Sequence, residues 1–135
     1  MANSVTAKED TAKLDDANVR SVISTYLAAL RAADAEMFRT AFHVDSAIVH
    51  CSLAEGTLVT SPLEAFIQEV AGLKKDHERV EESPRNLTVD LADCIACVRL
   101  DFDLYLGSTK YTGTDFFTLA KAGNRWTITH KLYCM

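Results

Sequence analysis

The sequence predicts an α+β domain in which three helices of the N-terminal half pack on one face of a mostly antiparallel sheet. Up to about residue 72, apolar residues recur with the 3.6-residue period of helices, and later they recur with a period of two. Helices followed by a run of strands are typical of this class. With 135 residues, 48% of them hydrophobic, the chain is large enough for one domain with a real core.

The first helix is predicted from one long apolar stripe. Asp15 or Asp16 can cap its start, so residues 1–14 are expected to form an N-terminal extension to a single domain at residues 15–135. The stripe has the spacing of one helix face and consists of Val19, Val22, Ile23, Tyr26, Leu27 and Leu30.

Capping residues predict two shorter helices. Asp34 can cap a second helix, after which residues 44–51 are rich in residues that favour a strand. The run Ser61-Pro62-Leu63-Glu64 combines a serine cap, a proline in the first helical position and a glutamate in the capping-box position. We expect this third helix to end at Gly72.

The C-terminal half alternates like a series of strands. The longest predicted strand covers residues 94–106, and two more cover residues 111–120 and 125–133. A weaker strand at residues 78–91 should be interrupted near Pro84, which cannot donate a ladder hydrogen bond. The inward face of the longest strand is expected to carry Cys94, Ala96, Val98, Leu100, Phe102, Leu104 and Leu106.

Composition excludes several classes of protein. A net charge of −5 and a pI near 5.3 argue against nucleic-acid binding, which needs concentrated Lys and Arg. No apolar run approaches the length of a membrane helix, and the first residues lack the apolar centre of a secretion signal, so we expect a cytoplasmic location. The four cysteines are then expected to be free and mostly buried thiols.

Two stretches resemble a known superfamily. They are AFHVDSAIV, which follows a DAEMF helix, and YTGTDFFTLAKAGNRWTITHKLY near the end of the chain. They are similar to the nuclear transport factor 2-like (NTF2-like) superfamily, in its SnoaL-like and putative lumazine-binding branches, and the resemblance covers roughly Asp15 to the C-terminus. It implies a cystatin-like cone, whose strongly bent sheet wraps around the long helix and leaves a deep apolar pocket. It also implies a homodimer formed through the outer face of the sheet.

The resemblance also implies two site residues. Steroid Δ-isomerases of this superfamily use a tyrosine of the first helix to stabilise an oxyanion and an aspartate of the first strand as general base. Tyr26 and His50 fall at these positions, and histidine can exchange a proton near neutral pH. A second oxyanion residue, a carboxylic acid, would fall near Thr112 or Gly113, where this chain has no acid. Authentic steroid isomerisation is therefore not expected.

Strand periodicity adds two further candidates. His130 shares its predicted face with Trp126 and should point into the same interior, and Asp115 could orient a histidine. Each candidate also has a structural interpretation. Tyr26 could serve packing alone, either histidine could be a core residue bonded to the backbone, and Asp115 could bond a neighbouring strand or face a dimer interface.

The predicted pocket suits a small hydrophobic or planar organic ligand. Its expected binding residues are Phe38, Phe42, Phe66, Phe102 and Trp126. No metal site is expected, because the spacing of Cys94 and Cys97 on a strand sends the two thiols to opposite faces. No cofactor is expected either, because the chain has neither a Gly-rich phosphate loop nor a nucleophile elbow.

These observations leave two hypotheses about function. The first is binding of a small hydrophobic molecule with cofactor-free acid/base catalysis of the isomerase, cyclase or dehydratase type. In it, His50 is the base, Tyr26 stabilises the oxyanion, and His130 assists. The alternative is a non-catalytic ligand-binding or homodimerisation module. Convergence of the three side chains on an open pocket would favour the enzyme.

Overall fold

The computed structural model describes the backbone of residues 2–135 and the side chains from Thr6 onward. Three helices precede or interrupt six strands, in the order α1 (Ala2–Ala32), α2 (Ala35–Ala41), β1 (Phe42–Ser52), β2 (Thr57–Pro62), α3 (Leu63–Asp76), β3 (Val80–Ala92), β4 (Ile95–Leu106), β5 (Thr109–Ala122) and β6 (Arg125–Cys134).

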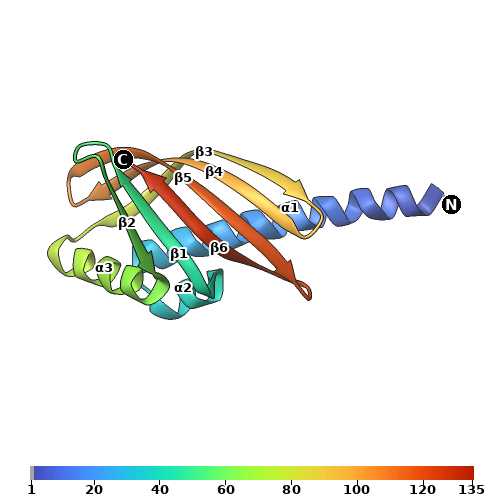
Figure 1. Ribbon diagram of the computed structural model, residues 1–135, viewed down its shortest axis with the longest axis horizontal. Coiled ribbons are helices and arrows are strands. Elements are labelled where there is room, and N and C mark those ends of the chain that lie inside the picture. The colour runs from blue at the N-terminus through green and yellow to red at the C-terminus, as the bar shows by residue number, and fades with distance from the viewer. Residues whose placement is uncertain (1) are drawn as a thin grey trace.

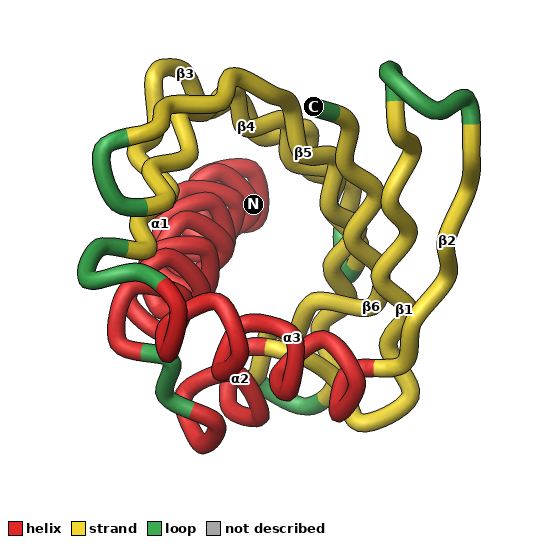
Figure 2. The backbone as a smooth tube through the Cα atoms, turned by 90° about the vertical axis from the view of Figure 1, so that its left-hand side faces the viewer, coloured by secondary structure: helices red, strands yellow, loops and turns green. Residues whose placement is uncertain are grey.

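The six strands form one mixed sheet with the order β2-β1-β6-β5-β4-β3. Neighbouring strands are antiparallel except β1 and β6, which are parallel. The sheet is strongly bent and curves around α1, while α2 and α3 close the remaining side (Figures 1 and 2). The predicted α+β class, with helices on one face of a bent sheet, is confirmed.

Helix α1 begins much earlier than predicted. It runs without a break from Ala2, and its first turns project beyond the sheet (Figure 1), so Asp15 and Asp16 lie inside the helix and do not cap it. The reason is local, because residues 2–14 hold no Pro or Gly and include several Ala and Lys, which are good helix formers. Asp15 is used by the tertiary structure instead and accepts hydrogen bonds from Lys121 Nζ at 2.9 Å and Trp126 Nε1 at 3.1 Å.

The boundaries of the shorter helices were partly predicted. Asp34 caps α2 as expected, because its Oδ1 accepts from the Met37 backbone N–H at 3.1 Å. Two predictions for α3 are wrong. Pro62 takes the capping position and Ser61 belongs to the edge strand β2, which the sequence pattern did not reveal. The helix continues through Gly72 to Asp76, because a glycine weakens a helix without forcing it to end.

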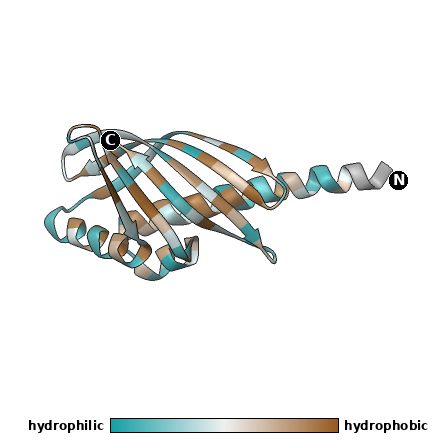
Figure 3. Cartoon of the chain, viewed as in Figure 1, coloured by the Kyte–Doolittle hydropathy of each residue, from teal (hydrophilic) through white to brown (hydrophobic). Residues whose placement is uncertain are grey.

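Alternation along the strands separates the core from the outer face of the sheet. Polar and apolar residues alternate visibly along the strands in Figure 3. Strand β4 buries Ala96, Val98, Leu100 and Phe102 in the interior, as predicted, while Cys97 and Arg99 between them are exposed and Asp101 is half-buried. Strand β3 runs through Pro84 without the predicted interruption, and its register with β4 shifts between Pro84 and Asn86 instead.

A β-bulge in β6 reverses the predicted inward face of this strand. The register with β5 shifts after the pair Leu119 with Ile128, so the next pair is Thr118 with His130. One extra residue in a strand sends all later side chains to the opposite face. Trp126 and Ile128 are buried before the bulge, and Lys131 and Tyr133 are buried after it. The prediction that His130 shares the interior with Trp126 is therefore wrong.

Candidate active site

Four polar side chains meet inside the cone, although each comes from a different element. They are Tyr26 of α1, Glu82 of β3, Asp115 of β5 and Lys131 of β6, with exposed fractions of 1%, 5%, 0% and 2%. Charged residues are almost never fully buried unless they are paired. The cluster contains two carboxyl groups and one ammonium group, so its protonation is set by burial and by mutual contacts.

Lys131 is held by one carboxylate and three aromatic rings. Its Nζ lies 3.1 Å from Asp115 Oδ1 and 3.5 Å from the centre of the Tyr133 ring. The rings of Phe66 and Tyr26 lie at 5.3 and 5.6 Å from the same nitrogen. Aromatic faces attract cations, and this attraction is stronger in a desolvated site. The ammonium group is therefore stabilised within the apolar interior.

Burial raises the pKa of Glu82 well above its ordinary range. The negative charge of Asp115 raises it further, the positive charge of Lys131 opposes the shift, and a hydrogen bond with Asp115 also favours the protonated form. The same physical causes act on Tyr26. Burial, followed by the charges of Glu82 and Asp115, raises the pKa of its hydroxyl well above the ordinary value. Tyr26 is therefore a neutral hydrogen-bond donor.

The cluster borders a cavity of about 150 Å³. Its polar wall includes Tyr26, Glu82, Lys131 and Tyr133, and Glu69 of α3 also lines it. Its other lining residues are apolar and comprise Leu30, Phe66, Val70, Leu73, Val80, Phe102, Leu104, Leu106 and Met135. An apolar cavity of this volume accommodates a molecule of about the size of benzene.

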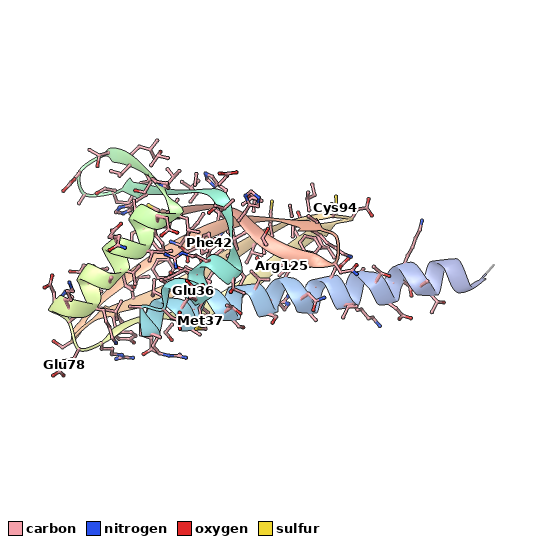
Figure 4. All side chains as sticks on the ribbon, turned by 90° about the horizontal axis from the view of Figure 1, so that it is seen from below. Glu36, Met37, Phe42, Glu78, Cys94 and Arg125 are labelled. Carbon is pink, nitrogen blue, oxygen red and sulfur yellow. The ribbon has the colours of Figure 1, made fainter. Side chains whose placement is uncertain are left out.

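The predicted binding residues divide into two groups. Phe66 and Phe102 line the cavity, but Phe38, Phe42 and Trp126 do not. Phe38 and Phe42 instead pack edge-on against the Tyr26 ring, with ring centres 6.3 and 5.9 Å away, and fill the interior. Figure 4 shows Phe42 where β1 begins beside α2. Trp126 contacts Asp15 farther along α1.

His50 lies one aromatic ring away from the cluster. It faces Tyr133 across the parallel β1–β6 pair, and the two rings stack with centres 4.4 Å apart and planes 4° apart. The Lys131 nitrogen is only 3.5 Å from the same ring centre, so it must occupy the other face of Tyr133. His50 does not line the cavity, and its buried Nε2 has no hydrogen-bond partner among the described residues.

His130 lies on the other side of the sheet. It pairs with the exposed Thr118 on β5 and with Ala47 on β1, on the outer face. Of the four predicted catalytic residues, the structure thus brings together Tyr26 and Asp115. It places His50 beside them and His130 away from them.

Other predicted features of the chain have simple structural outcomes. All four cysteines are free, but Cys94 and Cys97 are exposed, so the prediction of mostly buried thiols is wrong for these two. Cys94 lies in the turn between β3 and β4, toward the side on which α1 projects (Figure 4).

Among the described residues, no three side chains could together hold a metal ion. No described helix combines the length and the apolar character needed to cross a membrane.

A larger hollow lies outside the cone. It measures about 730 Å³ and is bordered by α1 and by the turns that join β3 to β4 and β5 to β6. Its buried polar group, Asp15, is already bonded to Lys121 and Trp126, and this contact lowers the pKa of Asp15. The buried polar group of the hollow is therefore already paired, and the interior cavity is the better candidate for a ligand site.

Sequence reasoning missed Glu82 and Lys131. Lys131 follows the bulge. Without the bulge, the alternation of side chains along the strand would place Lys131 on the solvent-facing side. Glu82 belongs to the strand with the weakest pattern, and its acidic neighbour Glu81 makes the pair look like a solvated edge. At Gly113, near the expected place of a second acid, a Cβ would lie 2.5 Å from the Cys134 carbonyl oxygen, so no side chain fits. Glu82 supplies a carboxyl group from another wall.

Comparison with known proteins agrees with this architecture. The family described as Putative lumazine-binding matches residues 14–134. An NTF2-like protein of unknown function from Shewanella baltica is similar in structure, with a TM-score of 0.70 and 23% identity over 89% of this chain and 92% of that chain. A search of curated proteins found no match.

Two further solved structures carry descriptions of activity. A protein described as a putative scytalone dehydratase, from Novosphingobium aromaticivorans, has a TM-score of 0.74 and 16% identity, over 93% of this chain and 86% of that chain. A protein described as a putative ketosteroid isomerase, from Shewanella frigidimarina, has a TM-score of 0.67 and 16% identity, over 86% and 94% of the two chains. At these identities the likeness shows the fold alone. With the family match over residues 14–134, the chain belongs to the putative lumazine-binding family, and its fold is like that of NTF2-like proteins.

Proposed function

We propose that the protein binds a small organic molecule in the interior cavity and catalyses proton transfer on it without a cofactor. The observation that carries this proposal is the cluster of Tyr26, Glu82, Asp115 and Lys131 at the wall of an otherwise apolar cavity. A buried carboxyl group with a strongly raised pKa in a pocket is a candidate acid/base group. The isomerase and dehydratase descriptions of two structural neighbours are consistent with chemistry of this kind.

Charge balance favours a protonated Glu82. With both carboxyls ionised, the buried cluster would carry a net negative charge, and Glu82 Oε2 and Asp115 Oδ2 would lack a hydrogen-bond donor among the described side chains. A proton on Glu82 makes the cluster neutral and supplies a donor for Asp115. We therefore infer that Glu82 holds its proton at neutral pH and that Asp115 and Lys131 form the charged pair.

Each member of the cluster then has a distinct role. Glu82 acts as the general acid and base, because it lines the cavity and its raised pKa keeps a proton available for transfer to the ligand. Tyr26 hydrogen-bonds the ligand oxygen on which charge develops. Asp115 does not line the cavity and is a positioning residue, since it orients both Glu82 and Lys131.

The two predicted histidines receive different roles in this proposal. His50 covers the face of Tyr133 opposite Lys131, so we assign it a supporting role and not that of the base. His130 lies on the outer face of the sheet, where exposed Phe116 and Leu132 pair across β5 and β6. We propose that this face forms a homodimer. A cytoplasmic location also remains a prediction.

The volume of the cavity limits the ligand. About 150 Å³ accommodates roughly one six-membered ring, whereas pockets for drug-sized ligands begin at about 300 Å³. We therefore expect a monocyclic or short-chain compound with an oxygen at one end. A purely structural module is disfavoured, because such an interior gains nothing from two buried carboxyl groups that could be replaced by apolar side chains.

Titration of phenol into the protein tests the proposal, because phenol combines one ring with one oxygen. We expect saturable binding that shifts the NMR signals of the cavity residues. Tyr26→Phe should weaken binding about fivefold to tenfold, since one hydrogen bond contributes about 1 kcal/mol. The control is Glu81→Gln, on the strand that carries Glu82 but with its carboxylate paired to Arg79. Binding that is absent, or is unaffected by Tyr26→Phe, would contradict the proposal.

A further inference from the structure

We propose that Lys131 reacts with the carbonyl carbon of an aldehyde or ketone bound in the cavity and forms an imine. This inference rests on the proposed function, which places a small oxygen-bearing ligand beside the cluster. It goes further by naming a nucleophile and a substrate class. A lysine in a hydrophobic pocket is a recognised nucleophile for carbonyl compounds.

Lys131 has the access that this reaction requires. It lines the cavity, although only 2% of the residue is exposed to solvent. Its ammonium group has three N–H bonds, of which one is directed to Asp115 and one to the face of Tyr133. The third N–H has no such contact, and we infer that a carbonyl carbon approaches the nitrogen from the cavity that Lys131 lines.

The partners needed for proton transfer lie beside the nitrogen. Asp115 Oδ1, at 3.1 Å, accepts a proton from the ammonium and releases the neutral amine. This transfer turns the ion pair into two neutral groups, so it adds no charge to the interior. The amine nitrogen then forms a bond to the carbonyl carbon. Glu82, in the same cavity wall, donates a proton to the carbonyl oxygen.

The reaction balances without an added reactant. After the addition, the nitrogen returns one proton to Glu82 and leaves a carbinolamine. Glu82 then protonates the carbinolamine hydroxyl, which leaves as water as the C=N bond forms. Asp115 finally passes the proton it took from the ammonium to Glu82 along their hydrogen bond, so both carboxyl groups return to their starting states. In sum, the ammonium form of Lys131 and the carbonyl compound give a protonated imine and one water molecule. The positive charge therefore stays on the nitrogen, beside Asp115 and the aromatic rings that stabilise it.

The surroundings distinguish Lys131 from Lys121 and Lys74. Lys121 also pairs with a carboxylate, Asp15, but its side chain is 24% exposed and lies in the outer hollow. Lys74 bonds to two backbone carbonyls on the surface. Water therefore competes with imine formation at these positions more than at Lys131, which is only 2% exposed and lines a mostly apolar cavity.

Reductive trapping tests the inference. The protein is incubated at neutral pH with butanone, or with benzaldehyde as a ring-containing probe, and sodium cyanoborohydride is added to reduce any imine to a stable amine. Peptide mass spectrometry then locates the label. We expect Lys131 to be labelled at least about tenfold more than Lys121 or Lys74, and phenol should compete with the labelling. The Lys131→Arg variant keeps the charge but should lose the preferential label.

The results separate this inference from the proposed function. Labelling confined to exposed lysines, with phenol still binding in the cavity, would overturn the imine and leave the ligand site intact. Loss of phenol binding as well would contradict both. If Lys131→Arg fails to fold, competition in the wild-type protein serves in its place. Phenol should then reduce the labelling of Lys131 and leave that of the exposed Lys74 unchanged, and equal labelling with and without phenol would overturn the inference.

Discussion

Replacement of Lys131 by methionine should destabilise the protein because it leaves the carboxylate of Asp115 without a partner. Asp115 is completely buried, and its Oδ1 lies 3.1 Å from the lysine nitrogen. Removing one member of a buried ion pair typically costs about 3–5 kcal/mol. Methionine retains the apolar contacts of the lysine stem, so most of this loss should come from the uncompensated charge.

The double variant separates the charge from the packing. In Asp115→Asn combined with Lys131→Met, no charge is stranded, so the loss should be smaller than the sum of the two single losses by about 2 kcal/mol or more. Urea unfolding at neutral pH, followed by circular dichroism, measures these free energies. The loss of about 3–5 kcal/mol expected for Lys131→Met is a large part of the 5–15 kcal/mol that a domain has as its free energy of unfolding.

A surface pair provides the matched control. Arg99 contacts Asp101 at 3.2 Å, but its side chain is 53% exposed, so Arg99→Met should change the free energy of unfolding little. If Lys131→Met were as mild as Arg99→Met, or if the two single losses simply added, the interior ion pair would not have the importance inferred from its burial.

Three further predictions concern a titration, a helix anchor and an interface. The pKa of Glu82 is higher in the folded than in the unfolded protein, so the native state binds more protons at pH values between the two. The free energy of unfolding should therefore fall as the pH rises through that range, by at most about 1.4 kcal/mol per pH unit. Urea unfolding of Glu82→Gln should lack this contribution, and an unchanged pH profile would contradict it. Asp15→Ala should cost about 2 kcal/mol in unfolding free energy, because Trp126 Nε1 and Lys121 lose their acceptor, and a loss near zero would refute the anchor. Phe116→Glu should convert a dimer to a monomer in light scattering, because Phe116 is 51% exposed on the outer face, and a wild-type monomer would exclude the interface.

The general fold could be predicted because strand periodicity and helix caps act over a few residues. The alternation of residues 94–106 and the cap at Asp34 needed no long-range information. The start of α1 was missed because Asp15 can cap a helix or bond a distant strand, and only the folded chain determines which occurs. Similarly, Ser61 and Pro62 read as a helix start until pairing with β1 places them in a strand.

The candidate site was harder to predict, because its members depend on one bulge and on contacts between distant strands. A shift of one residue in β6 exchanges His130 for Lys131 on the inner face. Tyr26 was found because it belongs to a clear helical stripe. Glu82 could not be found from local pattern. An acidic pair in a weak strand gives no indication that Lys131, three strands away in the sheet, compensates the charge of Asp115 beside Glu82.

The protonation state of Glu82 is the most informative quantity still to be measured. Carbon-13 NMR of protein labelled at glutamate side-chain carboxyl carbons, with Glu82→Gln to assign the signal, follows it directly. We predict that the Glu82 carboxyl stays protonated at neutral pH and that its titration responds to a bound phenol. A Glu82 signal that titrates in the ordinary range of an exposed glutamate would contradict the proposed acid/base site.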